Sequence, residues 1–233
     1  MAGWTWTVGM LVSSISLVAC PGSTVGLGTT PSPAASGAIV ELPSPRTDGA
    51  VSLERALQER RSVRSFTREP LTPEELGQLL WAGQGITADW GGRTAPSAGA
   101  LYPLEMYAAM PDALFRYLPE GHRAQVVLAI DVRGALAAAA LGQEAVAGAA
   151  VVLVIAAVSA RTEAKYGYRA ERYVHLEAGH AAQSVLLQAV ALGLTAVPVG
   201  AFSDEDVAHV LGLDRGEVPL YLIPVGHPAE DAG

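Results

Sequence analysis

The spacing of apolar residues along the chain predicts several helices. Apolar positions recur every three to four residues after Ser52 and again after Thr72, and both residues are suited to an N-cap. Thr72 is followed by Pro73 and then by Glu75, which completes a capping box. Gly193 stands after a long apolar segment, where a C-terminal cap is expected. We expect helices over about 52–60, 73–84, 176–192 and 203–212, and one or two short helices within 135–147.

Shorter apolar segments predict the strands, which we place at 104–109, 113–118, 151–158, 195–199 and 220–225. The segment 151–158 is apolar throughout, which indicates a strand buried on both faces. Residues 91–103 hold too much glycine and proline for regular structure, so they predict a long loop of the kind that often carries function. Helices and strands alternate irregularly, which favours an α+β fold over a Rossmann or TIM architecture.

The first 45 residues differ from the rest. An apolar run over residues 8–19 ends directly before Cys20, and a segment rich in Pro, Ser, Gly and Thr follows. This pattern favours a lipoprotein signal over 1–20 with a lipid-anchored Cys20, a flexible linker over 21–45 and one domain over 46–233. The first basic residue is Arg46, so a cytoplasmic leader and a wrongly chosen start codon remain alternatives. The run is too short for an ordinary membrane-spanning helix.

Composition restricts the chemistry. The 233 residues are 50% hydrophobic and 16% charged, which is typical of a single globular domain. A net charge of −8 argues against nucleic acid as a partner. Cys20 is the single cysteine, so an internal disulfide, a thiolate metal site and a CxxC pair are excluded, and redox chemistry would need a bound cofactor. His175 and His180 are five residues apart, which is not the spacing of two metal ligands on one helical face, and we predict no metal site.

A local basic cluster stands out against this background. The segment 60–66 reads Arg-Arg-Ser-Val-Arg-Ser-Phe and places three guanidinium groups and two hydroxyls at the end of a predicted helix. Charge-assisted hydrogen bonds from such groups suit a compact phosphate. The alternative is a solvated basic helix end, where cations are favourable against the helix dipole.

A second candidate is the pair Lys165 and Tyr166, which follows the buried strand by a few residues. A lysine whose pKa burial lowers toward neutrality can act as a general base, and a neighbouring tyrosine can donate or relay a proton. The alternative is a solvated lysine beside a half-buried tyrosine on a polar connection.

Four segments occur in the order seen in the nitroreductase superfamily, which this chain resembles over about residues 50–228. They are the basic segment 60–66, the segment 96–105 (Pro-Ser-Ala-Gly-Ala-Leu-Tyr-Pro-Leu-Glu), Lys165-Tyr166-Gly167, and residues 177–200 from Glu-Ala-Gly-His to Pro-Val-Gly. More narrowly, the chain is similar to the SagB/McbC/ThcOx-type dehydrogenases, which oxidise azolines to azoles in peptide natural products. The resemblance implies an FMN-binding α+β sandwich with a central mixed or antiparallel sheet flanked by helices. It also implies a homodimer with flavin sites at the subunit interface.

The resemblance also assigns roles to individual residues. The FMN phosphate and ribityl chain would be held by Arg60, Arg61, Ser62 and Arg64. One side of the isoalloxazine ring would be lined by Pro96, Ser97, Ala98 and Gly99, and the other by Pro198, Val199 and Gly200. Proton removal would be the task of Lys165 and Tyr166. Many nitroreductases complete the phosphate site with a C-terminal Lys or Arg, and here His227 is the one candidate.

The function that the resemblance implies is an FMN-dependent oxidoreductase that passes hydride between an azoline-like ring and flavin N5. One alternative is an NAD(P)H-dependent nitro or quinone reductase, and another is a non-catalytic flavin-binding surface protein. The expected partners are a small-molecule or peptide substrate and a second copy of the chain. Contact with a membrane would run through the anchor at Cys20, and a cytoplasmic location is the alternative.

Overall fold

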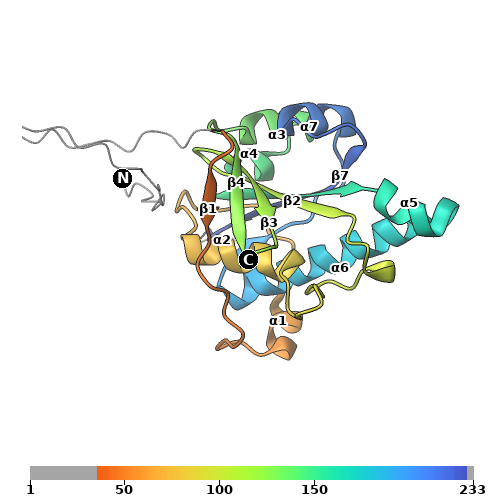
Figure 1. Ribbon diagram of the computed structural model, residues 1–233. Coiled ribbons are helices and arrows are strands. Elements are labelled where there is room, and N and C mark those ends of the chain that lie inside the picture. The colour runs from red at the N-terminus through yellow and green to blue at the C-terminus, as the bar shows by residue number, and fades with distance from the viewer. Residues whose placement is uncertain (1–35, 230–233) are drawn as a thin grey trace, which may run out of the picture.

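The computed structural model describes residues 36–229, which form one sheet covered by helices on both faces (Figure 1). The helices are α1 (Leu53–Glu59), α2 (Pro73–Gln84), α3 (Arg133–Ala139), α4 (Glu144–Gly148), α5 (Ala160–Tyr166), α6 (Ala170–Ala191) and α7 (Asp204–Leu211), with 3₁₀ turns η1 (Ala98–Ala100) and η2 (Gly167–Arg169). The strands are β1 (Ile39–Glu41), β2 (Leu104–Ala109), β3 (Leu114–Leu118), β4 (Arg123–Leu128), β5 (Val151–Val158), β6 (Thr195–Ala196) and β7 (Glu217–Gly226).

The sheet has seven strands in the order β1-β4-β3-β2-β5-β7-β6, and each neighbouring pair is antiparallel. β5 lies between β2 and β7, and seven of its eight residues are buried. The continuous apolar run over 151–158 therefore forms a central strand covered on both faces, as its composition predicts. The α+β class and the antiparallel form of the sheet are confirmed.

Two hydrophobic cores lie on opposite faces of this sheet, because successive side chains of a strand point to opposite sides. Leu153 and Ile155 of β5 belong to the core under α2 and α6. Val152 and Val154 belong to the core under α3, α4 and α7. Figure 1 shows these two helical layers above and below the strands.

The helix ends follow the capping signals of the sequence. Ser52 accepts a hydrogen bond from the Arg55 amide at the start of α1. Thr72 and Glu75 form the reciprocal bonds of a capping box at the start of α2. Gly193, which follows α6, has φ of +74°, a left-handed conformation that glycine adopts without steric cost.

Several boundaries differ from the sequence-based expectations. Residues 39–41, expected within the flexible linker, form strand β1 and pair with β4. Val40 is 4% exposed and belongs to the core, so the folded region begins before residue 46. α6 begins at Ala170 rather than near residue 176, and β7 begins at Glu217 rather than near residue 220. The strand expected over 195–199 is limited to residues 195–196, with one further bridge from Val199 to Leu222.

No helix within residues 36–229 is long and apolar enough to cross a membrane. Cys20 and the expected signal segment lie outside the described residues, so the lipid anchor stays a prediction.

Candidate active site

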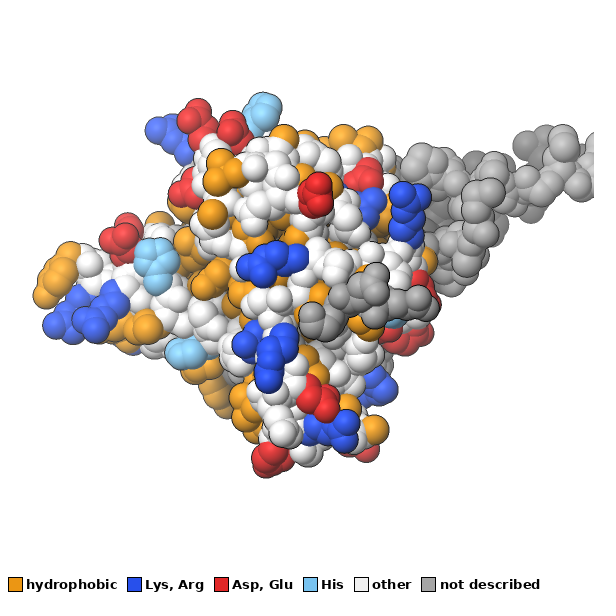
Figure 2. All heavy atoms as spheres, turned by 180° about the vertical axis from the view of Figure 1, so that it is seen from behind, with side chains coloured by type: hydrophobic (Ala, Val, Ile, Leu, Met, Phe, Trp, Pro, Cys, Tyr) orange, Lys and Arg blue, Asp and Glu red, His pale blue; other side chains and the backbone are white. Residues whose placement is uncertain are grey.

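The basic segment after α1 borders a cavity of about 670 Å³. Its other walls come from the end of α6 and from β6. The main chain fixes this arrangement, because the Val63 amide donates to the Ala196 carbonyl at 3.1 Å and Ser62 forms a parallel bridge with Ala196. The lining residues are Glu59, Arg61, Ser62, Val63, Arg64, Ser65, Leu186, Val190, Gly193, Leu194, Thr195 and Ala196. On the face opposite to that of Figure 1, basic side chains lie in a column near the middle of the molecule (Figure 2).

The predicted phosphate ligands separate into two groups. Ser62 and Arg64 line the cavity together with Arg61, whereas Arg60 is not among its lining residues. Arg61 Nη1 donates to the carbonyls of Gln58 at 2.9 Å and Arg60 at 2.8 Å, so this guanidinium caps the end of α1. Arg61 thus matches the alternative of a basic helix end. Ser62 and Arg64, with neighbouring Ser65, are the donors that best suit an anion.

A strained loop carries the second group of predicted residues. Gly99, Ala100 and Tyr102 have φ of +65°, +54° and +45°, and such values are uncommon for residues other than glycine. The Ser97 hydroxyl accepts a hydrogen bond from the Tyr102 amide at 2.9 Å, which holds this turn. Strain of this kind persists where the surrounding structure enforces it, and it is concentrated at functional sites.

Lys165 and Tyr166 lie in the last turn of α5, directly against this loop. A Cβ atom placed on Gly99 would lie 2.9 Å from Lys165 Nζ and 2.8 Å from Tyr166 Oη. The structure therefore brings the predicted catalytic pair and the predicted flavin-lining glycine together. Lys165 is exposed, so a single copy of the chain does not supply the burial that a general-base lysine needs.

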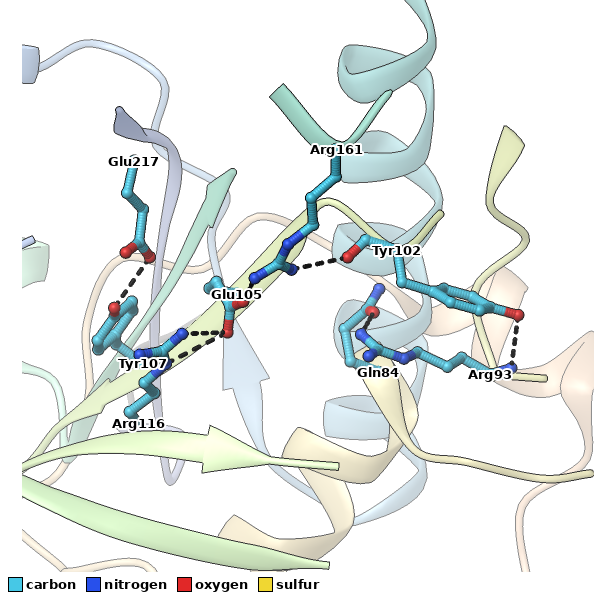
Figure 3. A network of polar contacts seen from close by, with 8 residues as sticks. All are labelled: Gln84, Arg93, Tyr102, Glu105, Tyr107, Arg116, Arg161 and Glu217. Atoms are coloured by element: carbon cyan, nitrogen blue, oxygen red, sulfur yellow. Dashed lines mark hydrogen bonds and ion pairs between the residues drawn. The ribbon is translucent and has the colours of Figure 1, made fainter. Parts of the chain in front are cut away.

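A polar network fastens α5 to the loop and to the sheet (Figure 3). Arg161 donates to the Tyr102 carbonyl at 2.9 Å and to Glu105 Oε1 at 2.5 Å. The second oxygen of Glu105 pairs with Arg116 at 3.0 Å. Arg93 lies over the Tyr102 ring at 4.5 Å, which holds the other end of the loop. Sequence analysis quoted Tyr102 and Glu105 within a motif but gave none of these residues a role, because the network depends on contacts between separate elements.

Glu177 is a further site residue that sequence analysis quoted within a motif but gave no role. It lies on the buried face of α6 and is 2% exposed. Burial raises its pKa to about 7, against the opposing effects of a hydrogen bond with Ser97 and the charge of Arg93. It lines a smaller cavity of about 290 Å³ between the loop and α6. The signal that could have identified Glu177 is an acidic residue on the otherwise apolar buried face of α6.

The remaining predicted residues lie elsewhere. Pro198, Val199 and Gly200 line neither of these two cavities. Val199 exchanges backbone hydrogen bonds with Leu222 at 2.8 and 3.0 Å, so it extends the sheet. His227 lies 3.8 Å from Glu75 and does not line the larger cavity. Within the described region, no group of three or more His, Cys, Asp or Glu side chains is arranged to hold a metal ion.

Comparison with known proteins identifies the family. The model of the nitroreductase family matches residues 57–227, and the chain belongs to this family. A candidate nitroreductase of Methanocaldococcus jannaschii is 45% identical over 186 residues, which cover 77% of this chain and 93% of that protein. The protein is therefore an oxidoreductase of the nitroreductase family.

Solved structures agree with this assignment. The crystal structure of a candidate nitroreductase from Ralstonia eutropha is 31% identical, with a TM-score of 0.75 over 82% of this chain and 90% of that one. Two others show the shared fold alone. The microcin synthetase McbBCD complex of E. coli matches at 24% identity and a TM-score of 0.66 over 74% of this chain and 70% of that one. The NADPH:FMN oxidoreductase of Vibrio harveyi, complexed with NAD⁺, matches at 24% identity and a TM-score of 0.59 over 77% of this chain and 70% of that one.

Proposed function

We propose that this protein is an FMN-dependent dehydrogenase of the SagB type. Its substrate would be an azoline-like ring, which is oxidised as hydride passes to the flavin. The observation that carries the proposal is the contact of Lys165 and Tyr166 with Gly99. A candidate base and a candidate proton donor lie within contact distance of the loop that the resemblance assigns to the flavin ring. General acid–base catalysis requires such proximity before any other property.

The residues present fit FMN. Ser62, Ser65 and Arg64 offer hydroxyl and guanidinium donors at one cavity, which suits a phosphate. Leu186, Val190 and Leu194 supply an apolar wall next to these donors. FMN, when bound, supplies a two-electron acceptor for hydride, and the protein's share is to position it and to set its electrostatic surroundings.

Lys165 as its neutral amine takes the proton that leaves the substrate ring, and the Tyr166 ring stabilises the ammonium group that results. The Lys165 Nζ atom lies 5.4 Å from the centre of the Tyr166 ring, a cation–π distance. We further propose a homodimer, in which a second copy covers this region and supplies the missing burial. The arm formed by α5 and the start of α6 extends from the body and exposes Tyr168 (92%) and Leu176 (53%) (Figure 1).

The proposal is tested with a synthetic peptide that carries one thiazoline ring. The Lys165→Met variant should retain bound flavin and lose at least 100-fold in the rate of azole formation at pH 7, since general acid–base catalysis contributes about 10²–10⁴-fold. Lys165→Arg keeps a cation but cannot act as a base at this pH, so it should be equally slow. Rates equal to that of the parent would refute the assigned role.

A second candidate is an NAD(P)H-dependent nitro or quinone reductase. The identity of 45% to the candidate nitroreductase of M. jannaschii favours it. In that case the purified protein oxidises NADPH in the presence of nitrobenzene, and Lys165→Met has little effect on this reaction. A third candidate, a non-catalytic flavin-binding protein, predicts bound FMN and no turnover with either substrate.

We also propose that Cys20 carries a lipid that anchors the protein to a membrane. The apolar run that ends at this residue supports the proposal. Full-length protein expressed in bacteria should partition into detergent, and the Cys20→Ser variant should stay in the aqueous phase. If both forms stay in the aqueous phase, the lipid anchor is refuted and the cytoplasmic alternative is favoured.

A further inference from the structure

The segment 36–46 precedes the part of the chain that the family model matches, which begins at residue 57, yet it packs on the domain. We call this segment the strap. Figure 1 shows it running from β1, at the edge of the sheet, past α2 toward α1. Val40 and Leu42 of the strap are 4% and 8% exposed and belong to the core under α2 and α6. The strap is therefore an addition to the matched region, and it is docked through two alternate apolar residues.

Beyond β1, the strap is held by hydrogen bonds to its main chain. The Leu42 amide donates to the His122 carbonyl at 3.2 Å, and His122 Nε2 bonds the Pro43 carbonyl at 3.0 Å. The Gln78 side chain accepts from the Arg46 amide at 2.8 Å and donates to the Arg46 carbonyl at 3.0 Å. Bound peptides are recognised in the same way, through their backbone and alternate side chains. A segment with so few buried side chains can open locally while the domain stays folded.

His122 holds the strap as a neutral imidazole. The Pro43 carbonyl can only accept, so Nε2 carries the hydrogen and Nδ1 accepts from the Tyr117 hydroxyl at 2.9 Å. Tyr117 is 2% exposed, which leaves its hydroxyl little access to water. An imidazolium has an N–H on both sides, so Nδ1 could no longer accept the hydrogen of this buried hydroxyl. Protonation of His122 therefore disrupts the chain of hydrogen bonds that ends at Pro43.

The surroundings of His122 also disfavour its charged form. α2 approaches through Gly77, where a Cβ atom would lie 3.3 Å from Nε2, and the strap presents the Pro43 carbonyl. From β3 comes Tyr117, on which the charge of Arg93 acts, and burial raises the pKa of this tyrosine, so it stays neutral. Burial lowers the pKa of His122, and the bond to Pro43 offsets this only in part.

We propose that the strap is a pH-sensitive device, in which protonation of His122 breaks its bond to Pro43 and releases residues 36–46 from the domain. A released histidine has an ordinary pKa of about 6.5. As the pH falls below this value, the released form binds more protons than the docked form, so release is increasingly favoured. Release frees eleven residues, or about 36 Å of extended chain, toward the proposed anchor at Cys20. The inference does not depend on the flavin.

The experiment is hydrogen exchange of the purified full-length protein, followed by mass spectrometry, between pH 5.0 and 7.5. The exchange of residues 36–46 is compared at each pH with that of a synthetic peptide of the same sequence, which removes the intrinsic pH dependence. We expect the protection of the strap to fall about tenfold from pH 7.5 to pH 5.0. The protection of β5 should not fall, because the domain remains folded.

Three variants separate the switch from ordinary packing. His122→Gln keeps an N–H donor for Pro43 but does not titrate, so the protection of the strap should not depend on pH. His209→Gln is the matched control, because His209 is exposed on α7, which covers the opposite face of the sheet, and it should behave like the parent. Gln78→Ala loses the bonds to Arg46 and should lower protection at every pH while keeping its pH dependence.

Three results would overturn the proposal. The first is a strap without protection at pH 7.5, and the second is a parent whose strap protection is independent of pH. The third is a pH dependence that persists in His122→Gln or disappears in His209→Gln.

Discussion

Arg161 and Glu105 form an ion pair of 2.5 Å that fastens the first turn of α5 to strand β2 (Figure 3). Arg161 also donates to the carbonyl of Tyr102, the last strained residue of the loop. One guanidinium thus sets the position of the helix that carries Lys165 relative to the loop that carries Gly99. Precise placement of catalytic groups depends on supporting contacts of this kind.

Replacing Arg161 tests this positioning role. Arg161→Ala should lower the free energy of unfolding by about 1–3 kcal/mol, because it removes hydrogen bonds that involve charged groups. Arg55→Ala breaks the exposed ion pair with Glu59 and should lower the free energy of unfolding by about 0–1 kcal/mol. Urea denaturation measures both values. Turnover should fall in Arg161→Ala with flavin binding retained, and an unchanged turnover would show that α5 is held by other contacts.

Gly99 offers a test of the close contact itself. Gly99→Ala introduces a Cβ at 2.8–2.9 Å from Tyr166 Oη and Lys165 Nζ, and it also strains a left-handed residue by about 1–2 kcal/mol. Gly142→Ala imposes a similar strain at φ +76°, with no atom within 4 Å of the new Cβ. Both variants should lose similar stability in thermal unfolding. A large loss of turnover is expected in Gly99→Ala alone, and equal turnover in the two variants would contradict the proposed contact.

Glu177 should make stability depend on pH. Its pKa rises from 4.5 to about 7 in the folded state, so between these values the folded protein binds more protons than the unfolded chain. Stability therefore falls as pH rises through this window, and above pH 7 the buried charge costs about 3 kcal/mol. Glu177→Gln lacks this cost. The free energy of unfolding of Glu177→Gln minus that of the parent should therefore be larger at pH 8 than at pH 5.

Urea denaturation of both proteins at the two pH values measures this difference. Burial also raises the pKa of Glu217, which acts in the same direction, but this contribution is common to both proteins and cancels in the comparison. A stability difference that is the same at pH 5 and pH 8 would contradict the buried state of Glu177.

The first strand provides a prediction on folding. Val40→Ala should lower the free energy of unfolding by about 1–2 kcal/mol, because Val40 is 4% exposed within the core. Ile39→Ala is the control, since Ile39 points outward and is 39% exposed. Its effect should stay within about 0.5 kcal/mol. Similar values for the two variants would argue against the pairing of β1 with β4.

Much of this fold is predictable from local signals. The start of α2 follows from its capping box, and the bounds of β5 follow from an uninterrupted apolar run. β1 was missed because three residues in a segment rich in Pro, Ser and Gly give no periodicity. α5 was missed because it is short and polar, and its ion pair from Arg161 reaches Glu105, which is distant in the sequence.

The candidate site shows the same division. The basic segment 60–66 and the loop 96–99 were visible as residue patterns, and the contact of Gly99 with Lys165 was implied only by the family resemblance. The sequence does not show that the Arg61 guanidinium turns back onto the carbonyls of Gln58 and Arg60, and its role as a phosphate ligand stays a prediction. The unpartnered oxygen of Glu177 is a property of packing, which no spacing rule reveals.

The most direct test of the central claim is the flavin content of the purified full-length protein and of Ser62→Ala/Arg64→Ala, measured by absorbance and by chromatography of the released chromophore. The account predicts a yellow parent that releases FMN, and a variant whose FMN affinity is lower by at least tenfold, which corresponds to about 1.4 kcal/mol. Arg55 lies in α1, the helix that precedes Ser62 and Arg64, and it does not line the larger cavity, so Arg55→Ala should bind FMN like the parent. A colourless parent that also fails to bind added FMN would contradict the proposed function.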